Sequence, residues 1–237
     1  MVATSPKTVA WHRSGGLVPY PDALAAMDRR AAQVREGATP ELLWFLEHPP
    51  LYTAGTSAAE SELLTPSRFP VFKTGRGGRF TYHGPGQRVA YAIMDLRKPG
   101  PPDVRRYVFD LEAWLIAALA RLGITGERRP GRIGIWVETA NGEAKIAALG
   151  VRVSRWVTTH GIALNVAPNL SHFGGIVPCG IAEYGVTSLE ALGVKADMAA
   201  VDTALKEAFE ETFAVRLMPG ADPLAGLAEQ QSQTVGS

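Results

Sequence analysis

Two residues in this 237-residue chain are best suited to covalent and acid–base chemistry: its one cysteine, Cys179, and the lysine Lys145. Cys179 lies between a proline and a glycine in a segment typical of a loop, and this placement favours an accessible, reactive thiol over a buried one. Lys145 begins the run KIAALG, and strand alternation puts its side chain on the same face as Ala147 and Leu149. The pattern leaves open whether this lysine lies at a sheet rim in water or beside a cavity.

A second group of candidate residues lies in the segment GRGGRFTYHGPGQ, residues 75–87, in which five of the 13 residues are glycine. Glycine lets a backbone approach a ligand closely and leaves its N–H groups accessible. A surface loop would explain the glycines alone, but a simple spacer rarely combines two arginines, a tyrosine and a histidine. The pair His160-Gly161 falls within an apolar run, where a single histidine is more often structural than catalytic.

The elements that must position these residues alternate between strand-like and helix-like patterns. Asn141-Gly142 separates two β-rich runs and predicts a hairpin that pairs residues 133–139 with 143–153. Apolar residues at helical spacing predict a helix over 104–122, with Asp103 as its N-cap. A further helix is expected over residues 21–36, and a last helix is expected to begin at about residue 197. Further strands are expected at 41–47, 87–96 and 156–166. The fold class is therefore α+β, with a mixed, largely antiparallel sheet flanked by helices.

We expect one catalytic domain over residues 1–218, with room for a small C-terminal subregion at 187–218, and then a flexible tail over 219–237. Composition excludes several classes of protein. The formal charge is +1, which excludes nucleic-acid binding by bulk charge, and one cysteine allows neither an intrachain disulfide nor a Cys-based zinc site. The longest apolar run has eight residues, and the first residues lack the apolar region of a secretory signal, so we expect a cytoplasmic protein without a membrane partner.

Taken together, the motifs resemble one known family, the octanoyltransferases of lipoate biosynthesis, also called lipoate-protein ligase B. The matching strings are HPPLYTAG (48–55), RGGRFTYHGPGQ (76–87), KIAALGVRV (145–153), VTTHGIALNV (157–166), PCGI (178–181) and GVTSL (185–189). The resemblance covers about residues 20 to 215, and the order and spacing of the motifs make it specific. Two positions depart from the family pattern: Gly75, where an acidic residue is usual, and Thr159, where an aromatic residue is common.

The resemblance implies a fold similar to the catalytic fold of the biotin and lipoate ligases, with a small accessory sheet. It implies transfer of an octanoyl group from octanoyl-acyl carrier protein to a specific lysine of lipoyl domains, in E2 subunits of 2-oxoacid dehydrogenases and in the glycine cleavage H protein. Cys179 matches the acyl-thioester nucleophile of a ping-pong route, and Lys145 matches the lysine that activates it. The donor thioester is already activated, so no ATP and no metal are expected.

By the same resemblance, a set of mostly small or polar residues would bind the acyl chain and its carbonyl end, with His160 in support. These residues are Arg76, Gly77, Gly78, Arg79, Phe80, Thr81, Tyr82, His83, Ala148, Leu149, Gly150, Gly161, Ile162 and Ala163. Residues 68–106 hold nine Lys or Arg and two Asp, so they could steer an acidic carrier protein, although the charges could equally well only solvate different faces.

Three other functions remain open from the sequence. An ATP-dependent lipoate or biotin ligase would share the fold but needs no cysteine nucleophile. A non-catalytic acyl-binding module would explain the glycine-rich segment but not the pair of Lys145 and Cys179. A hydrolase could pair Cys179 with His160 or His83. The absence of GxxxxGK[ST], GxGxxG, HExxH and GxSxG disfavours the nucleotide, dinucleotide, zinc-protease and serine-hydrolase classes that carry these motifs.

Overall fold

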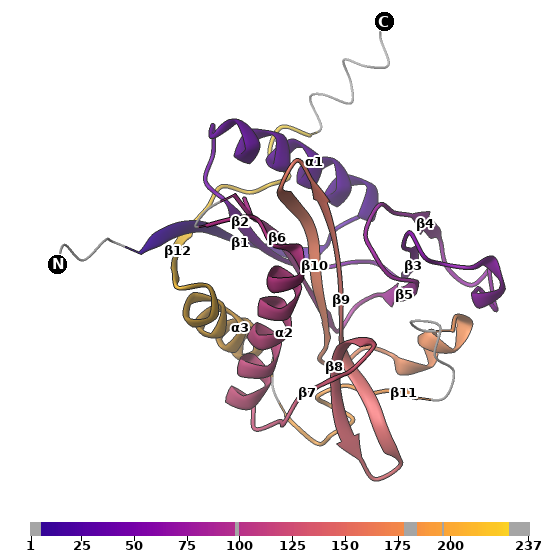
Figure 1. Ribbon diagram of the computed structural model, residues 1–237. Helices are drawn as coiled ribbons and strands as arrows, with labels where there is room; N and C mark the ends of the chain where they lie inside the picture. The colour runs from indigo at the N-terminus through magenta and orange to yellow at the C-terminus, as the bar shows by residue number, and fades with distance from the viewer. Residues whose placement is uncertain (1–5, 98–99, 178–183, 196, 228–237) are drawn as a thin grey trace, which may run out of the picture.

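The computed structural model describes residues 6–97, 100–177, 184–195 and 197–227, and within them one large sheet organises the chain (Figure 1). Its strands pair in the order β12-β1-β2-β6-β10-β9-β8-β7, and β11 adds to β9. In that order they are β12 (Val215–Pro219), β1 (Lys7–Leu17), β2 (Leu42–Glu47), β6 (Gln87–Ile93), β10 (Val157–Asn165), β9 (Gly142–Ser154), β8 (Arg132–Thr139), β7 (Glu127–Arg129) and β11 (Gly185–Val186). β1 runs parallel to β12 and β2, and β11 runs parallel to β9. The other pairs are antiparallel, which confirms the predicted mixed sheet.

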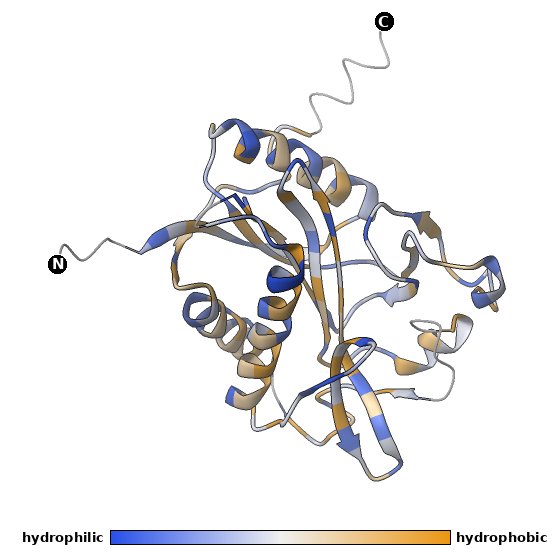
Figure 2. Ribbon diagram, in the orientation of Figure 1, coloured by the Kyte–Doolittle hydropathy of each residue, from blue (hydrophilic) through white to orange (hydrophobic). Residues whose placement is uncertain are grey.

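Three helices cover the two faces of this sheet (Figure 1). α1 (Tyr20–Glu36) packs on one face, and α2 (Val104–Arg121) and α3 (Met198–Phe213) lie against each other on the opposite face. Figure 2 shows hydrophobic and hydrophilic residues alternating along each helix, as expected of amphipathic helices on a sheet. The predicted N-cap of α2 is confirmed, because the Asp103 side chain accepts a hydrogen bond from the Arg106 N–H at 3.0 Å.

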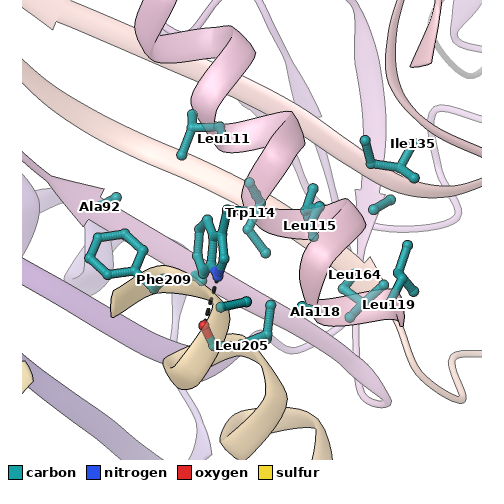
Figure 3. Close-up of a cluster of buried hydrophobic side chains, with 14 of the residues drawn as sticks. Ala92, Leu111, Trp114, Leu115, Ala118, Leu119, Ile135, Leu164, Leu205 and Phe209 are labelled. Carbon is teal, nitrogen blue, oxygen red and sulfur yellow. Dashed lines mark hydrogen bonds between the residues drawn. The ribbon is translucent and has the colours of Figure 1, made fainter. Parts of the chain in front are cut away.

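The larger core lies between the sheet and the α2–α3 pair (Figure 3). Trp114 on α2 is fully buried and donates its indole N–H to the carbonyl oxygen of Leu205 at 2.7 Å. Its ring meets that of Phe209 edge-on, with centroids 5.0 Å apart. Because the indole N–H is satisfied, this large apolar surface is buried without the cost of an unpaired donor.

A second, smaller sheet confirms the accessory sheet that the family resemblance implied. It consists of β4 (Val71–Lys73), β3 (Leu51–Ala54) and β5 (Phe80–His83), and its aromatic cluster packs against the short 3₁₀ helix η2 (Leu170–Gly175). A short turn leads from β5 into β6 of the main sheet. Gly86 in this turn has φ +83°, and a Cβ there would lie 2.3 Å from the Ala167 carbonyl oxygen, so only glycine fits without a shift. The turn fixes where the accessory sheet sits relative to the main one.

The prediction of a flexible tail from residue 219 is wrong for the part that the structure describes, residues 219–227. The Gly220 N–H donates to the Trp11 carbonyl at 2.8 Å, and Arg29 on α1 donates to the Pro223 carbonyl at 2.6 Å. Leu224 and Leu227 pack against the core beneath α1. These few apolar anchors are set among polar and small residues and leave no periodic signal, so the sequence alone predicts a tail here.

Candidate active site

A cavity of about 500 Å³ opens where the glycine-rich loop, β9, β10 and α2 meet. This volume falls within the range of small-molecule binding sites. All but one of the residues that the resemblance assigned to substrate binding line it, and so do both Lys145 and His160. The exception is Tyr82, whose side chain turns into the aromatic cluster of the accessory sheet and lies within hydrogen-bond distance of His172 Nδ1, at 2.8 Å. The fold therefore brings the predicted pocket residues together around one cavity, and Tyr82 packs behind its wall.

Small residues on two neighbouring strands form one side of the cavity. In the antiparallel β9–β10 pair, Ala148 lies opposite Ala163 and Gly150 opposite Gly161, so all four share a face of the sheet. A Cβ at Gly161 would lie 2.2 Å from the Ala90 carbonyl oxygen, so this position accepts no side chain. The four residues leave a lane of low side-chain volume with apolar walls, suited to a narrow aliphatic chain.

Lys145 lies on this same face because β9 contains a bulge. Lys145 pairs with Trp136 while Ala147 pairs with Ile135, so two steps on β9 match one step on β8. Ile146 and Ala147 both enter the core beneath α2, whereas Lys145 faces the cavity together with Ala148. The expected face shared with Ala147 is therefore wrong, because strict alternation fails at the extra residue.

The Lys145 side chain is held at a defined place rather than solvated at a rim. It is only 6% exposed, so the alternative of a rim lysine in water is wrong. Its ammonium donates a hydrogen bond to the Ile133 carbonyl oxygen at 2.8 Å and lies 5.0 Å from the centroid of the Trp136 ring. Gly134 leaves room for it, since a Cβ there would lie 2.8 Å from Lys145 Cε and 3.0 Å from Nζ.

The glycine-rich loop is shaped by Arg76, whose guanidinium is turned inward and buried. Its Nη2 donates to the Thr53 carbonyl at 2.9 Å, to the Thr53 hydroxyl at 2.7 Å and to the Arg79 carbonyl at 3.1 Å, while Nη1 donates to the Gly77 carbonyl at 2.9 Å. Two of these bonds hold the loop to β3 and two are within the loop, and Gly77 and Gly78 line the cavity. Arg79 instead points outward and pairs with Glu62.

Tyr20, Tyr91 and His160 line one part of the cavity, His48 lies behind Tyr91, and burial keeps these side chains uncharged near neutral pH. Burial of the His160 ring, together with the nearby charge of Arg76, lowers the pKa of His160 to about 3. Burial lowers the pKa of His48 to about 4. His160 Nε2 lies 3.0 Å from the Tyr20 hydroxyl, and His48 Nε2 lies 2.7 Å from the Tyr91 hydroxyl. His48 Nδ1 donates to the Val18 carbonyl at 2.6 Å, so its Nε2 accepts the Tyr91 proton.

His160 also has φ +65°, in the left-handed region that histidine tolerates better than most residues. Its pairing to Tyr20 and its neutral state favour a structural role in the pocket wall. His83 is buried as well, and its Nδ1 lies 2.7 Å from the Gln87 side-chain oxygen. Burial lowers the pKa of both imidazoles well below the usual value, so both are weak bases, which disfavours the Cys-His hydrolase.

Cys179 lies outside the described residues, so its distance to Lys145 remains a prediction. The chain on either side is placed. Val177 donates its N–H to the Glu62 carbonyl at 2.8 Å, and Tyr184 packs its ring against Trp136, with centroids 5.5 Å apart. Val186 then pairs with Lys145 itself in the parallel β9–β11 ladder. The described residues that follow Cys179 in the sequence therefore lie beside the strand that holds Lys145.

The basic stretch at 68–106 does not form one continuous charged surface. Arg88 is buried and bound in a bidentate pair to Asp202, Arg97 pairs with Asp95, and Arg106 pairs with Asp110 on its own helix. Arg76 is buried in its loop. Charge counted along the sequence therefore does not predict a docking face here.

Sequence reasoning missed several residues that line or shape the cavity. These are Tyr20, Tyr91, Arg132, Ile133 and Gly134.

Among the described residues, no group of His, Cys, Asp and Glu has the arrangement of a metal site. No helix in that part of the chain is long and apolar enough to cross a membrane.

Comparison with known proteins places these features in a family. The lipoyl protein ligase A/B catalytic domain matches residues 19–210. An octanoyltransferase from Paramagnetospirillum magneticum is 61% identical over 206 residues, which cover 86% of this chain and 97% of that protein.

Two solved structures share the fold at low identity. The bipartite lipoate protein ligase from Thermoplasma acidophilum, studied with its E2 lipoyl domain, superposes with a TM-score of 0.71 at 16% identity, over 97% of this chain and 93% of that one. A lipoate-protein ligase A bound with ATP has a TM-score of 0.70 at 16% identity, over 97% and 95% of the two chains. Fold, pocket and sequence agree: this chain belongs to the octanoyltransferase family, within the lipoyl protein ligase A/B catalytic domain.

Proposed function

We propose that this protein takes an octanoyl group from octanoyl-acyl carrier protein and transfers it, through a thioester on Cys179, to a lysine of lipoyl domains. The observation that carries the proposal is the buried Lys145 ammonium at the end of an apolar lane of small residues, in a chain 61% identical to an octanoyltransferase. An aliphatic acyl chain fits the lane, and its carbonyl would then lie beside the lysine.

The chemistry divides into two balanced steps. In the first, the Cys179 thiolate attacks the thioester carbonyl, the bond to the carrier sulfur breaks, and the carrier leaves as a thiol that takes up one proton. In the second, the acceptor lysine amine attacks the acyl-cysteine, an amide forms, and Cys179 is released as thiolate while the amine loses a proton. Lys145 is suited to exchange protons in both steps because an ammonium can donate and an amine can accept, which a guanidinium cannot.

The acceptors we propose are the lipoyl domains of 2-oxoacid dehydrogenase E2 subunits and the glycine cleavage H protein. The structural likeness to a ligase studied with its E2 lipoyl domain supports this class of acceptor. We propose the cytoplasm as the place of the reaction, since a thiol nucleophile must stay reduced and the chain has one cysteine.

The same fold also holds ligases that use ATP, so the rival function is an ATP-dependent lipoate ligase. One assay distinguishes the two functions. The purified chain is incubated with octanoyl-carrier protein and a lipoyl domain, in the presence of a chelator and without nucleotide, and the lipoyl domain is weighed by mass spectrometry. Gain of one octanoyl group supports the transferase. Transfer from free octanoate that requires ATP and magnesium would move the function to the ligase class.

A further inference from the structure

Arg132 is the first residue of β8, and three contacts hold its guanidinium group in place. Its Cζ lies 4.7 Å from the centroid of the Trp136 ring and 4.1 Å from that of Tyr184, so the group is stacked on two aromatic rings. Its Nη2 donates to Glu143 Oε2 at 2.8 Å. Stacking and pairing together leave the guanidinium little freedom to turn.

The remaining terminal nitrogen of this group, Nη1, is buried and has no hydrogen-bond partner among the described residues. A buried, unsatisfied N–H on a charged group is costly, and such exceptions in folded proteins call for a ligand or another explanation. Arg132 lines the same cavity as Lys145. The unsatisfied donor therefore belongs to the wall of the candidate active site.

Its place relative to Lys145 indicates which part of a substrate it would meet. The carbonyl of Ile133, the next residue, holds the Lys145 ammonium, and both cations lie near the Trp136 ring. The lane of Ala148 and Gly150 follows Lys145 along β9, beside the buried residues Gly161 and Ala163 of β10. The Arg132 guanidinium is on the other side of Lys145, because it binds Glu143, which comes two residues before Lys145 on β9. The cavity thus runs from the apolar lane, past Lys145, to Arg132 toward the exposed turn of the β8–β9 hairpin.

We propose that Arg132 Nη1 donates a hydrogen bond to an oxygen of the thiol arm that carries the acyl group. This inference rests on the proposed function. The one oxygen of an octanoyl group is its carbonyl, which the proposed function places beside Lys145, and the acceptor lysine uses its lone pair to attack that carbonyl, so neither is left to accept from Arg132. The arm leaves the thioester toward solvent and carries amide carbonyls and a phosphate, which are the acceptors that a guanidinium N–H binds.

The test uses three octanoyl thioesters that differ only in the leaving thiol: carrier protein, pantetheine and ethanethiol. The rate of acyl-enzyme formation is followed by intact mass in a single turnover, without acceptor. Arg132→Met keeps a side chain that packs on the two rings but removes the donor. We expect its kcat/KM to fall about ten- to hundredfold with the carrier donor, the factor for losing a hydrogen bond to a charged group. With the ethyl thioester it should stay within about twofold of the parent.

The pantetheine donor identifies the oxygen. A loss with pantetheine equal to that with carrier protein supports an amide carbonyl, and a loss seen only with carrier protein supports the phosphate. Arg132→Lys, which keeps a positive charge beside Glu143, should show the same selectivity and serves if the methionine variant does not fold. Arg128→Met is the matched control, because Arg128 stacks on Phe109 at 3.9 Å and pairs with Glu112 at 3.1 Å but does not line the cavity.

Equal losses of both Arg132 variants on all three donors, or no loss on any, would overturn the inference and leave Arg132 a structural residue. A parent protein that forms no acyl-enzyme from any thioester would instead refute the proposed function. The two failures are therefore distinguishable in the same experiment.

Discussion

Replacing Gly134 with alanine should displace the Lys145 amine and slow octanoyl transfer without removing any titratable group. The added Cβ would lie 2.8 Å from Lys145 Cε and 2.9 Å from the Ala147 carbonyl oxygen. Carbon atoms in contact prefer about 3.5–4.0 Å, so the flexible lysine end must move by about 0.7–1.2 Å, since the backbone oxygen is fixed in the β-ladder. That shift breaks the 2.8 Å bond to Ile133 which sets the position of the amine.

The expected magnitude follows from that shift. A catalytic group misplaced by about 1 Å costs on the order of 10²-fold in rate, and complete loss of a positioned acid–base group costs about 10²–10⁴-fold. We therefore expect Gly134→Ala to lower kcat about 10²-fold, and Lys145→Met to lower it at least as much. In the double variant the two losses should not add, because both act through the same amine.

Strain from the backbone must be separated from this effect. Gly134 has φ +129°, so alanine also costs stability there, on the order of 1–3 kcal/mol. Gly142 in the same hairpin has φ +98°, but an added Cβ there would meet nothing within 4 Å, so Gly142→Ala carries the backbone cost alone. Both variants are compared by thermal unfolding and by single-turnover transfer. Equal transfer rates for the two variants at matched folded fraction would refute the positioning of Lys145 by Gly134.

Three further predictions concern named side chains. Lys145→Arg keeps a cation but cannot accept a proton, so iodoacetamide labelling of the cysteine at neutral pH should survive better than turnover, and equal losses in both would contradict a proton-transfer role. Folding lowers the pKa of His160 from 6.5 to about 3, so below pH 6.5 the unfolded chain binds a proton that the folded chain does not. The contribution of this group to the free energy of unfolding is therefore complete above pH 6.5 and falls as the pH drops toward 3. His160→Asn should reduce that slope by up to about 1.4 kcal/mol per pH unit in urea titrations, and an unchanged slope would count against the neutral buried imidazole. Asp202→Asn leaves the buried Arg88 unpaired and should cost about 3–5 kcal/mol of unfolding free energy, whereas Asp110→Asn, in an exposed helix pair, should cost less than about 0.5 kcal/mol; similar costs would contradict a buried pair.

The features that follow from local chemistry could be predicted from the sequence. The Asp103 cap, the hairpin signalled by Asn141-Gly142 and the apolar spacing of α2 are set by residues close together in the sequence, and all three are confirmed, with the hairpin turn at Ala140 and Asn141. The pocket residues were found differently, through the family resemblance, because residues from three separated segments meet there only in the fold.

The face of Lys145 could not be predicted by alternation. The bulge at Ile146 depends on how β9 matches β8, and a one-residue shift reverses every side chain beyond it. The same holds for Arg132, which reads as an ordinary surface arginine until the fold brings Trp136 and Tyr184 onto its two faces. Its unsatisfied nitrogen is a property of the folded cavity alone.

The sequence patterns also missed β12, one edge strand of the main sheet, and its neighbour β1. β1 carries two glycines and alternates poorly, and β12 is five residues long, so neither has a strong strand pattern. They form because each pairs in parallel with a neighbour distant in sequence, which no local pattern records.

The most direct test of the account is the mass and the location of the acyl group after the first half-reaction. The parent protein is mixed with octanoyl-carrier protein without nucleotide, metal or acceptor, weighed intact, digested and sequenced by mass spectrometry. We expect one added octanoyl group, located on the peptide that contains Cys179, lost on addition of a lipoyl domain and absent from Cys179→Ser. An unmodified protein that still acylates the lipoyl domain, or an octanoyl group on any other residue, would contradict it.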